Sequence, residues 1–238
     1  MIWLWFVTLF SFAVKGLCGF ANSLVFTTLL SFGDSIVHIT PINLLLNYPS
    51  HILMIWNYRK AIDYKICLPL CGMVIVGIVP GVIFFKNADI STLEIIFGIF
   101  VVLIALDMLF GRKKPAQGAQ NSWKMGLLGV VSGFACGFCN IGVLVGAYVG
   151  KVTDDTDSFK ANVTIVYFVA DTIKMVMYAY LSILTVDILL ESLVLVPISL
   201  LGLCLGIKGS KMINEAAVKK MVLIMLILSG LALVINNL

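Results

Sequence analysis

The sequence predicts an all-α integral membrane protein built as an inverted repeat. Each half is expected to contain a re-entrant hairpin, or a short two-helix hairpin, plus three transmembrane helices. Composition is the first reason: 61% of the residues are hydrophobic and 12% are charged, whereas a soluble domain has about 25% charged residues. The second is a repeated motif, because Cys-Gly-Phe-Ala-Asn at 18–22 recurs as Cys-Gly-Phe-Cys-Asn at 136–140. Each copy interrupts an apolar stretch, as in the halves of secondary transporters.

Apolar segments of two lengths follow one another in each half of the chain. Each half begins with two short pieces, below the roughly 20 residues that a spanning helix needs. Three longer segments come next in each half. The short pieces are 1–15, 19–33, 125–136 and 139–150, and the long ones are 36–57, 66–85, 93–111, 160–180, 188–207 and 218–237. Because a membrane offers the backbone no water, we expect all of them to be helical.

Basic residues are concentrated in alternate loops. Most of the 16 lysine and arginine residues lie at 57–65, 112–124, 151–160 and 208–220. The remaining loops, at 34–35, 86–92 and 181–187, contain only Lys86. Since cytoplasmic loops are enriched in Lys and Arg, the basic loops are predicted to be cytoplasmic and both chain termini extracytoplasmic, in a multi-pass protein of the inner membrane.

The short segments are predicted to form hairpins. Residues 125–150 must leave the cytoplasm and return, yet two full passes need about 40 residues. A re-entrant hairpin with its tip at 136–140 satisfies this, and 1–33 is expected to enter likewise from the outside. Two thin helices that cross a locally thinned bilayer are the alternative.

Three full spans per half make the second half inverted relative to the first. The first repeat is then 1–111, the cytoplasmic linker 112–124 and the second repeat 125–238. Equivalent spans also carry a GxxxG spacing, Gly77 with Gly81 and Gly202 with Gly206. This spacing favours ordinary close helix packing, and its recurrence supports the alignment of the repeats.

The two tips are the predicted substrate site. A second half-helix should begin at about 21–23 and 139–141, and a helix N-terminus presents unpaired N–H groups that bind anions. Asn22 and Asn140 can donate amide N–H groups to a ligand, while Gly19 and Gly137 let the backbone turn and approach it. The alternative is that each asparagine only caps its helix and each glycine only turns the chain.

Further polar residues within spans are candidates for the same site. Asn43 and Asn162 form a second symmetry pair, with Tyr48 and Tyr167 five residues on and Thr164 near Asn162. Their alternative role is capping or interhelical hydrogen bonding.

Ionisable residues inside spans suggest function because burying charge in a membrane is costly. Lys15, at the end of the first half-helix, is placed to attract an anion or to extend toward a water-filled cavity. Asp171 and Lys174 can pair with each other or relay protons. His51 is a second candidate for proton coupling, or a hydrogen-bonded core histidine.

The cysteines and the absence of catalytic motifs limit the chemistry that the sequence predicts. Cys18 and Cys136 occupy equivalent tip positions where a thiol can touch a substrate, although buried thiols usually act as small apolar residues. No set of ligands for a metal is recognised, and no cofactor is expected. The sequence has no Ser-His-Asp set, phosphate loop or paired carboxylates, so an enzyme is not predicted. The basic residues sit in loops between spans, so nucleic-acid binding is not expected.

Several segments together resemble a known family. The first is a span with scattered polar residues, from Pro41-Ile42-Asn43 to Trp56. The second is the segment Phe159-Lys160-Ala161-Asn162-Val163-Thr164, which continues to Tyr178-Ala179-Tyr180, and the third is the span from Asp187 to Gly206. Over essentially its whole length the chain resembles the sulfite exporter TauE/SafE family of bacterial inner-membrane transporters. It departs from the family pattern at the breaks, where a run of glycines is usual and Phe20, Phe138 and cysteines stand here.

The resemblance implies export of small anions such as sulfite and organosulfonates. With the residues above, it leads us to expect a secondary transporter of a small, sulfur-containing anion (sulfite, thiosulfate or an organosulfonate). Alternating access around opposed hairpin tips, coupled to protons, is the expected mechanism. An anion channel, a transporter of small organic carboxylates and a membrane interaction subunit are the alternatives. The expected partners are the anion and the lipid bilayer, and homo-oligomerisation is left open.

Overall fold

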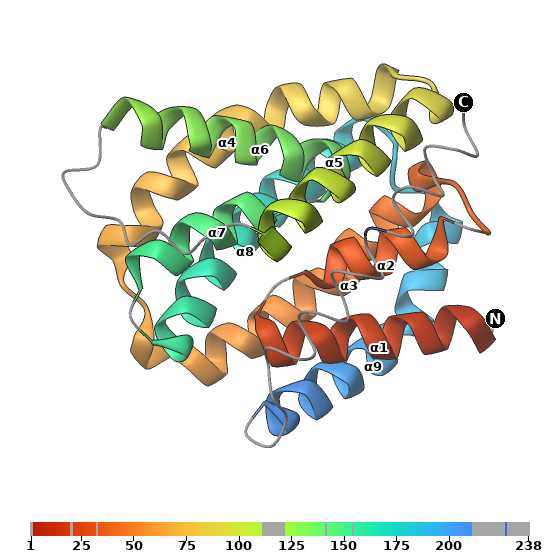
Figure 1. The fold of residues 1–238 in the computed structure, drawn as a ribbon. Coiled ribbons are helices and arrows are strands. Elements are labelled where there is room, and N and C mark those ends of the chain that lie inside the picture. Colours follow the sequence, from red (N-terminus) through yellow and green to blue (C-terminus); the bar gives the residue numbers. More distant parts are fainter. Residues whose placement is uncertain are drawn as a thin grey trace.

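The protein is helical throughout the residues that its computed structural model describes, which are 2–19, 21–31, 33–110, 122–140, 142–153, 155–210 and 227 (Figure 1). The first half contains α1 (Ile2–Cys18), α2 (Asn22–Leu30), α3 (Ile36–Tyr58), the 3₁₀ helix η1 (Arg59–Ala61), α4 (Tyr64–Asn87) and α5 (Ile90–Phe110). The second half contains α6 (Ser122–Cys139), α7 (Val143–Val152), α8 (Thr156–Tyr180) and α9 (Val186–Gly209). The predicted span 218–237, apart from residue 227, and most of the linker 112–124 lie outside the described residues.

The five long spans predicted within the described part of the chain each correspond to one helix, namely α3, α4, α5, α8 and α9. Within that part, α4, α8 and α9 are long and apolar enough to cross a membrane. α3 is as long, with 23 residues, but it is not in this group. It carries Asn43, Asn47 and His51, all of which are buried. α3 therefore brings several polar side chains into the interior of the protein.

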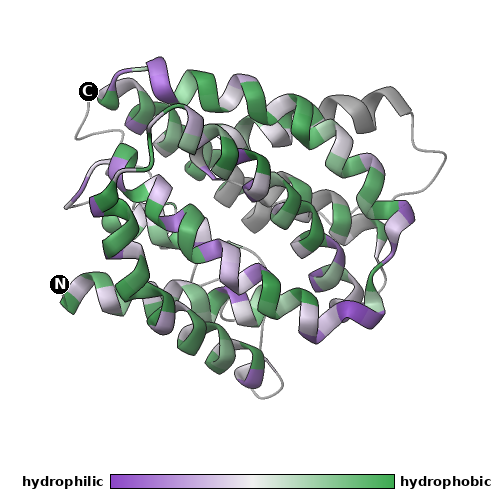
Figure 2. Ribbon diagram, turned by 180° about the vertical axis from the view of Figure 1, so that it is seen from behind, coloured by the Kyte–Doolittle hydropathy of each residue, from purple (hydrophilic) through white to green (hydrophobic). Residues whose placement is uncertain are grey.

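Polarity is reversed relative to a soluble protein. The outer faces of α4 and α9 expose large apolar side chains such as Leu68 and Leu193, whereas Lys15, Lys174 and Asp171 are buried. Figure 2 shows hydrophobic residues along most of the helices and hydrophilic ones at turns such as that between α3 and α4. Apolar surface outside and charged groups inside are what a lipid environment favours. The fold is that of a membrane protein.

The two interrupted segments break later than predicted. α1 continues to Cys18 rather than ending near residue 15, and α6 continues to Cys139 rather than 136. The first break turns through Gly19 and Ala21, which have φ angles of 82° and 72°, and the second through Asn140, with φ 60°. Among the described residues of the two breaks, these left-handed positions redirect the chain.

Each broken helix packs against a long helix of the other half. α1 lies along α9, and α6 lies along α4; these are the most extensive helix contacts. A Cβ atom on Gly81 would lie 3.1 Å from the Cα atom of Gly137, and one on Gly206 would lie 2.9 Å from that of Gly16. The prediction that both GxxxG pairs serve close helix packing is confirmed.

The turns divide between the two ends of the molecule. In Figure 1 the N-terminus and the turn between α4 and α5 lie at one end, and the turn between α3 and α4 lies at the other. α6 begins at this second end, so α1 and α6 run into the protein from opposite ends.

Candidate functional site

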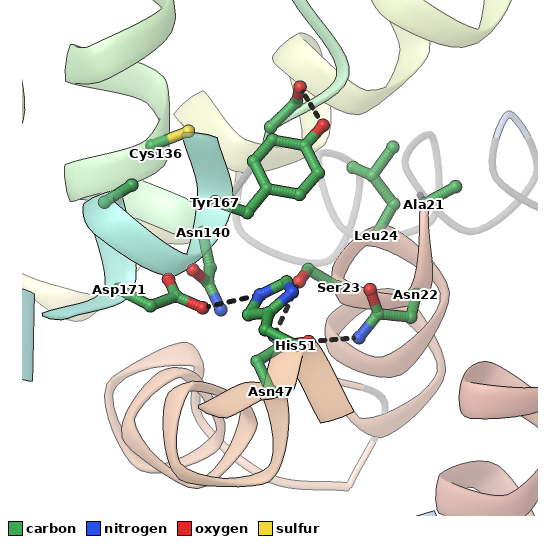
Figure 3. A pocket seen from close by; sticks show the side chains of 12 residues that line it. Ala21, Asn22, Ser23, Leu24, Asn47, His51, Cys136, Asn140, Tyr167 and Asp171 are labelled. Carbon is green, nitrogen blue, oxygen red and sulfur yellow. Dashed lines mark hydrogen bonds and ion pairs between the residues drawn. The ribbon is translucent and has the colours of Figure 1, made fainter. Parts of the chain in front are cut away.

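The two breaks meet at one buried cavity between α2, α3, α6 and α8. It is lined by Ala21, Asn22, Ser23, Leu24, Asn47, His51, Cys136, Asn140, Gly142, Tyr167, Ala170 and Asp171 (Figure 3). The first four come from the first break and the start of α2, and Asn140 and Gly142 from the second break. Segments far apart in the sequence therefore build a single site.

Asn140 directs an amide donor into this cavity. Its Oδ1 accepts a hydrogen bond from Nζ of Lys174 at 2.8 Å, and Nζ also donates to the carbonyl oxygen of Cys136 at 2.9 Å. An ammonium group can only donate, so Asn140 must turn its oxygen toward Lys174 and its Nδ2 group away. Nδ2 is buried and has no hydrogen-bond partner among the described residues. A buried donor of this kind is suited to a ligand oxygen.

The first break is part of a closed polar network. Nδ2 of Asn22 donates to Oδ1 of Asn47 at 2.8 Å, and the same oxygen accepts from Nζ of Lys15 at 2.7 Å. Lys15 also donates to Oγ of Ser50 at 2.6 Å, while Nδ2 of Asn47 donates to Oγ of Ser23 at 3.2 Å. One N–H of the Asn22 amide is therefore already in use, whereas the amide nitrogen of Asn140 has no partner among the described residues.

His51 and Asp171 connect the two halves of the chain at the cavity. Nε2 of His51 lies 3.1 Å from Oδ2 of Asp171, and both side chains are almost fully buried. Nδ1 of His51 is buried without a partner in the described part of the protein. Asp171 thus bonds to His51 of α3, and Lys174 bonds to Asn140 and to the carbonyl oxygen of Cys136. The pairing of Asp171 with Lys174 within α8 stays a prediction.

Neither asparagine acts as the N-cap of the helix that follows it. α2 has Ala21 as its N-cap residue and α7 has Gly142, and no side chain accepts a capping hydrogen bond at either end. α2 begins at Asn22, as predicted, whereas α7 begins at Val143, later than expected. The first N–H groups of both helices lack partners within their own helix, and residues of both starts line the cavity. The site thus has donors and the positive ends of two helix dipoles.

A comparison with protein families identifies the chain. The model described as "Sulfite exporter TauE/SafE" matches residues 4–233 of the 238. The chain belongs to the sulfite exporter TauE/SafE family. Membership implies a membrane transporter of sulfur-containing anions, and the family is one of transporters rather than of enzymes. Comparisons with curated proteins and with solved structures gave no match.

Several residues predicted for the site of this TauE/SafE protein lie elsewhere. Gly137 does not make the second turn, since it lies inside α6 with its Cα atom against Gly81. Gly19 does turn the chain, and it packs on the side chain of Lys160. The residues that do not line the cavity are Gly19, Gly137, Asn43, Asn162, Thr164, Lys15, Lys174 and Cys18.

The second symmetry pair has bonds between and within helices. Oδ1 of Asn162 accepts from the backbone N–H of Asp63 at 2.8 Å and from Sγ of Cys67 at 3.0 Å. Asn43 accepts from Asn47 at 3.1 Å. Thr164 donates to the carbonyl oxygen of Lys160 at 2.6 Å. These contacts link α8 to the start of α4 and support Asn47.

Sequence analysis missed Asn47 and Ser23, and it named Tyr167 only through its pairing with Tyr48. The signal for Asn47 is its spacing, since it lies four residues after Asn43 and four before His51, on one face of α3. Tyr167 donates from its hydroxyl group to the carbonyl oxygen of Gly142, which fixes the second break to α8. Tyr48 instead packs against Phe168 in a tilted arrangement, with ring centroids 5.0 Å apart.

Proposed function

We propose that this TauE/SafE protein is a secondary transporter that binds a small sulfur-containing anion, such as sulfite, thiosulfate or an organosulfonate, between the two breaks. The observation that carries the proposal is the unpartnered Nδ2 group of Asn140 in a buried cavity that both breaks line. The family supplies the chemical class of the substrate. An oxyanion offers several acceptor oxygens to the donors gathered there.

The charge around the cavity favours an anion. Among the described residues that line it, Asp171 is the only acidic one, and it is paired with His51. Lys15 and Lys174 lie directly behind the lining amides of Asn47 and Asn140. Buried cations require compensation, because an unpaired charge in a low-dielectric interior is costly. A bound anion provides part of that compensation.

The packing of the two halves supports an inverted repeat. α1 of the first half lies on α9 of the second, and α6 of the second half lies on α4 of the first. This reciprocal exchange is what a two-fold relation between repeats would produce. α2 has nine residues and rises about 14 Å, less than half of the roughly 30 Å hydrocarbon core. Its length favours re-entrant hairpins over two thin crossing helices.

Alternating access around the first break is supported by a second cavity. This cavity is lined by Asn57, Tyr58, Thr156, Asp157, Lys160, Ile207 and Ser210. Gly19 lies on the Lys160 side chain, and the next residues of the break line the central cavity. The first break thus stands between the two cavities, so a shift of this segment would open the central site. The second cavity adjoins loops that are predicted to be cytoplasmic from their basic residues, which supports a cytoplasmic opening. The proposed driving gradient is that of protons.

Ligand-dependent thermal stability of the purified protein tests the substrate class. Sulfite, thiosulfate and methanesulfonate are compared with acetate and with a neutral sulfone. We expect the sulfur oxyanions to raise the melting temperature. Asn140→Ala should reduce the affinity by about ten- to 150-fold, the worth of one hydrogen bond to a charged group. Asn87→Ala, which changes an exposed amide at the end of α4, should leave it unchanged.

Flux in proteoliposomes separates transport from the alternatives. A transporter gives saturable uptake that Asn140→Ala slows, whereas a channel gives unsaturated conductance with high turnover. Stabilisation by acetate alone would move the proposal to carboxylates. If no anion stabilises the protein and no flux is measured, the proposed function is wrong.

A further inference from the structure

The bond between His51 and Asp171 fixes which nitrogen of the imidazole ring carries a proton. A carboxylate only accepts, so Asp171 takes the hydrogen bond from Nε2–H of His51 at 3.1 Å (Figure 3). In the neutral ring Nδ1 is then a bare acceptor. Nδ1 is buried, has no partner in the described structure, and belongs to a residue that lines the cavity. A neutral His51 would therefore turn a lone pair toward an anion that needs donors.

The surroundings of His51 contain charges of both signs. Asp171 is in hydrogen-bond contact with the ring, and the ammonium group of Lys15 of α1 bonds to Asn47, one helical turn before His51 on α3. The other titratable side chains near the cavity are Lys174 and Tyr167 of α8 and Cys136 of α6. α2 has no titratable side chain, and Glu191 of α9 pairs with His38 near the start of α3. Glu94 of α5, Asp187 and Lys208 of α9, and Arg59 and Lys60 of η1 do not line the cavity.

We infer that His51 binds one proton together with each transported anion, and that Asp171 positions it to do so. This inference rests on the proposed anion site. Protonation of Nδ1 leaves the bond from Nε2 to Asp171 intact and converts Nδ1 from an acceptor into a donor. The anion then receives hydrogen bonds from His51 and from Nδ2 of Asn140. One proton is taken from solvent and no covalent bond between heavy atoms changes.

Coupling of this kind has a definite sign. An anion beside the ring favours the protonated form, and by linkage the proton raises the affinity for the anion to the same extent. The two ligands occupy the cavity together and therefore cross the membrane in the same direction. Above the pH at which His51 titrates, anion affinity falls about tenfold per pH unit, because one proton is bound per anion.

Calorimetric titration of the purified protein with thiosulfate or methanesulfonate measures the proton directly. Neither probe titrates from about pH 5 to 8, the range in which histidine changes charge, so any proton uptake belongs to the protein. Titrations in buffers of different ionisation enthalpy should give uptake approaching one proton per anion at the alkaline end. His38→Gln is the matched control, because the chain has two histidines and His38 lies outside the cavity. This variant should retain both the uptake and the pH dependence.

Asp171→Asn separates the proposed role from simple support of the site. The asparagine amide can donate to Nε2, so the neutral ring can carry its proton on Nδ1 and present a donor without further protonation. We expect anion binding that no longer weakens as pH rises, with proton uptake lost. His51→Gln should also bind without proton uptake, through its own amide donor.

The outcomes distinguish this inference from the proposed function. If no probe binds at any pH, the anion site itself is wrong and the inference falls with it. Wild-type binding with unchanged affinity across the pH range, or with proton release, overturns the proton site alone. The inference is also overturned if Asp171→Asn keeps the wild-type pH dependence. Should both variants fail to fold, proton uptake by the wild type and by His38→Gln still decides.

Discussion

The two breaks carry almost the same five residues but have different backbones. In the first copy the helix ends at Cys18, and Asn22 opens the next helix. In the second copy the helix continues through the motif, and Asn140 itself occupies the left-handed turn, with φ 60°. The equivalent glycines differ accordingly, since Gly19 turns the chain while Gly137 packs on α4.

This difference changes what each asparagine can offer a ligand. Asn22 gives its amide donor to Asn47, whose oxygen is also held by Lys15. Asn140 receives a bond from Lys174 and keeps its own donor unengaged among the described residues. A buried lysine serves each break, but from α1 at the first and from α8 at the second. Sequence symmetry therefore does not imply equal chemistry, and we expect the second break to contribute more to anion binding.

The largest effect is expected where the two breaks are alike, in the glycine contacts that hold each broken helix. A Cβ atom on Gly16 would lie 2.5 Å from the carbonyl oxygen of Leu203, and one on Gly137 would lie 2.5 Å from that of Ile78. Overpacking alone costs about 1–3 kcal/mol, and a clash with backbone leaves less room to relax. Gly16→Val and Gly137→Val should each abolish monodisperse protein in size-exclusion chromatography.

Gly72→Val is the matched control for these variants. Nothing lies within 4 Å of a Cβ atom at Gly72, which is on the same helix as Gly77 and Gly81. This variant should elute and melt like the wild type. A folded Gly137→Val protein with wild-type stability would show that α6 is not held closely against α4.

An intermediate effect on anion affinity is expected from substituting the two buried lysines, Lys15 and Lys174. The effect should be larger at the second break than at the first. Lys174→Met leaves Oδ1 of Asn140 without its ammonium donor, whereas the carbonyl oxygen of Cys136 still accepts from the backbone N–H of Asn140 at 3.0 Å. An orphaned buried acceptor costs about 1–3 kcal/mol, and Asn140 loses the contact that orients its Nδ2 group. In Lys15→Met, Oδ1 of Asn47 still accepts from Asn22. We expect anion affinity to fall at least tenfold more in Lys174→Met than in Lys15→Met, measured by calorimetric titration.

Lys86→Met provides the reference for the loss of one positive charge. Lys86 lies exposed in the last turn of α4, so its substitution should change affinity by less than about twofold at physiological salt. Equal losses of anion affinity in Lys174→Met and Lys15→Met would mean that the two breaks contribute alike to anion binding. The difference between Asn22 and Asn140 would then have no effect on function.

The helices of the described residues could largely be predicted from the sequence, because the length of each apolar stretch indicates a span and the duplicated motif marks the two interrupted ones. The positions of the breaks were less accessible. Cys-Gly-Phe at 18–20 and at 136–138 look equivalent, yet Gly137 faces the backbone of Ile78 and stays helical. Which glycine turns the chain depends on the helix packed beside it, and no local sequence pattern contains that information.

For the candidate site, sequence symmetry pointed to residues that matter structurally but not always to the cavity. Asn162 pairs with Asn43 in the sequence, but it binds the backbone of Asp63. Asp171 and Lys174 lie one helical turn apart and yet bond to His51 and Asn140. Partners between helices depend on side-chain direction and helix rotation, which a single sequence does not specify.

The smallest effect is expected at Ala21, and it tests whether the first break is strained. Ala21 has φ 72° and ψ −4°, a left-handed conformation that costs an L-residue about 1–2 kcal/mol. Glycine adopts it freely, but a glycine also makes the unfolded chain more flexible, which offsets about 0.4–1 kcal/mol. Ala21→Gly should therefore raise stability by up to about 1 kcal/mol, an increase of a few degrees in melting temperature for a chain of this length.

The equivalent substitution in the second break, Asn140→Gly, is the comparison for the small change in stability expected from Ala21→Gly. Asparagine tolerates the left-handed region better than alanine because its side chain can bond locally, so Asn140→Gly should gain little stability while removing the amide that faces the cavity. Ala161→Gly, inside α8, should lose about 1 kcal/mol, as glycine does in any helix interior. A loss of stability in Ala21→Gly would mean that the methyl group of Ala21 contributes more to the cavity wall than its conformation costs. The first break would then be a rigid wall of the site rather than a strained segment ready to move.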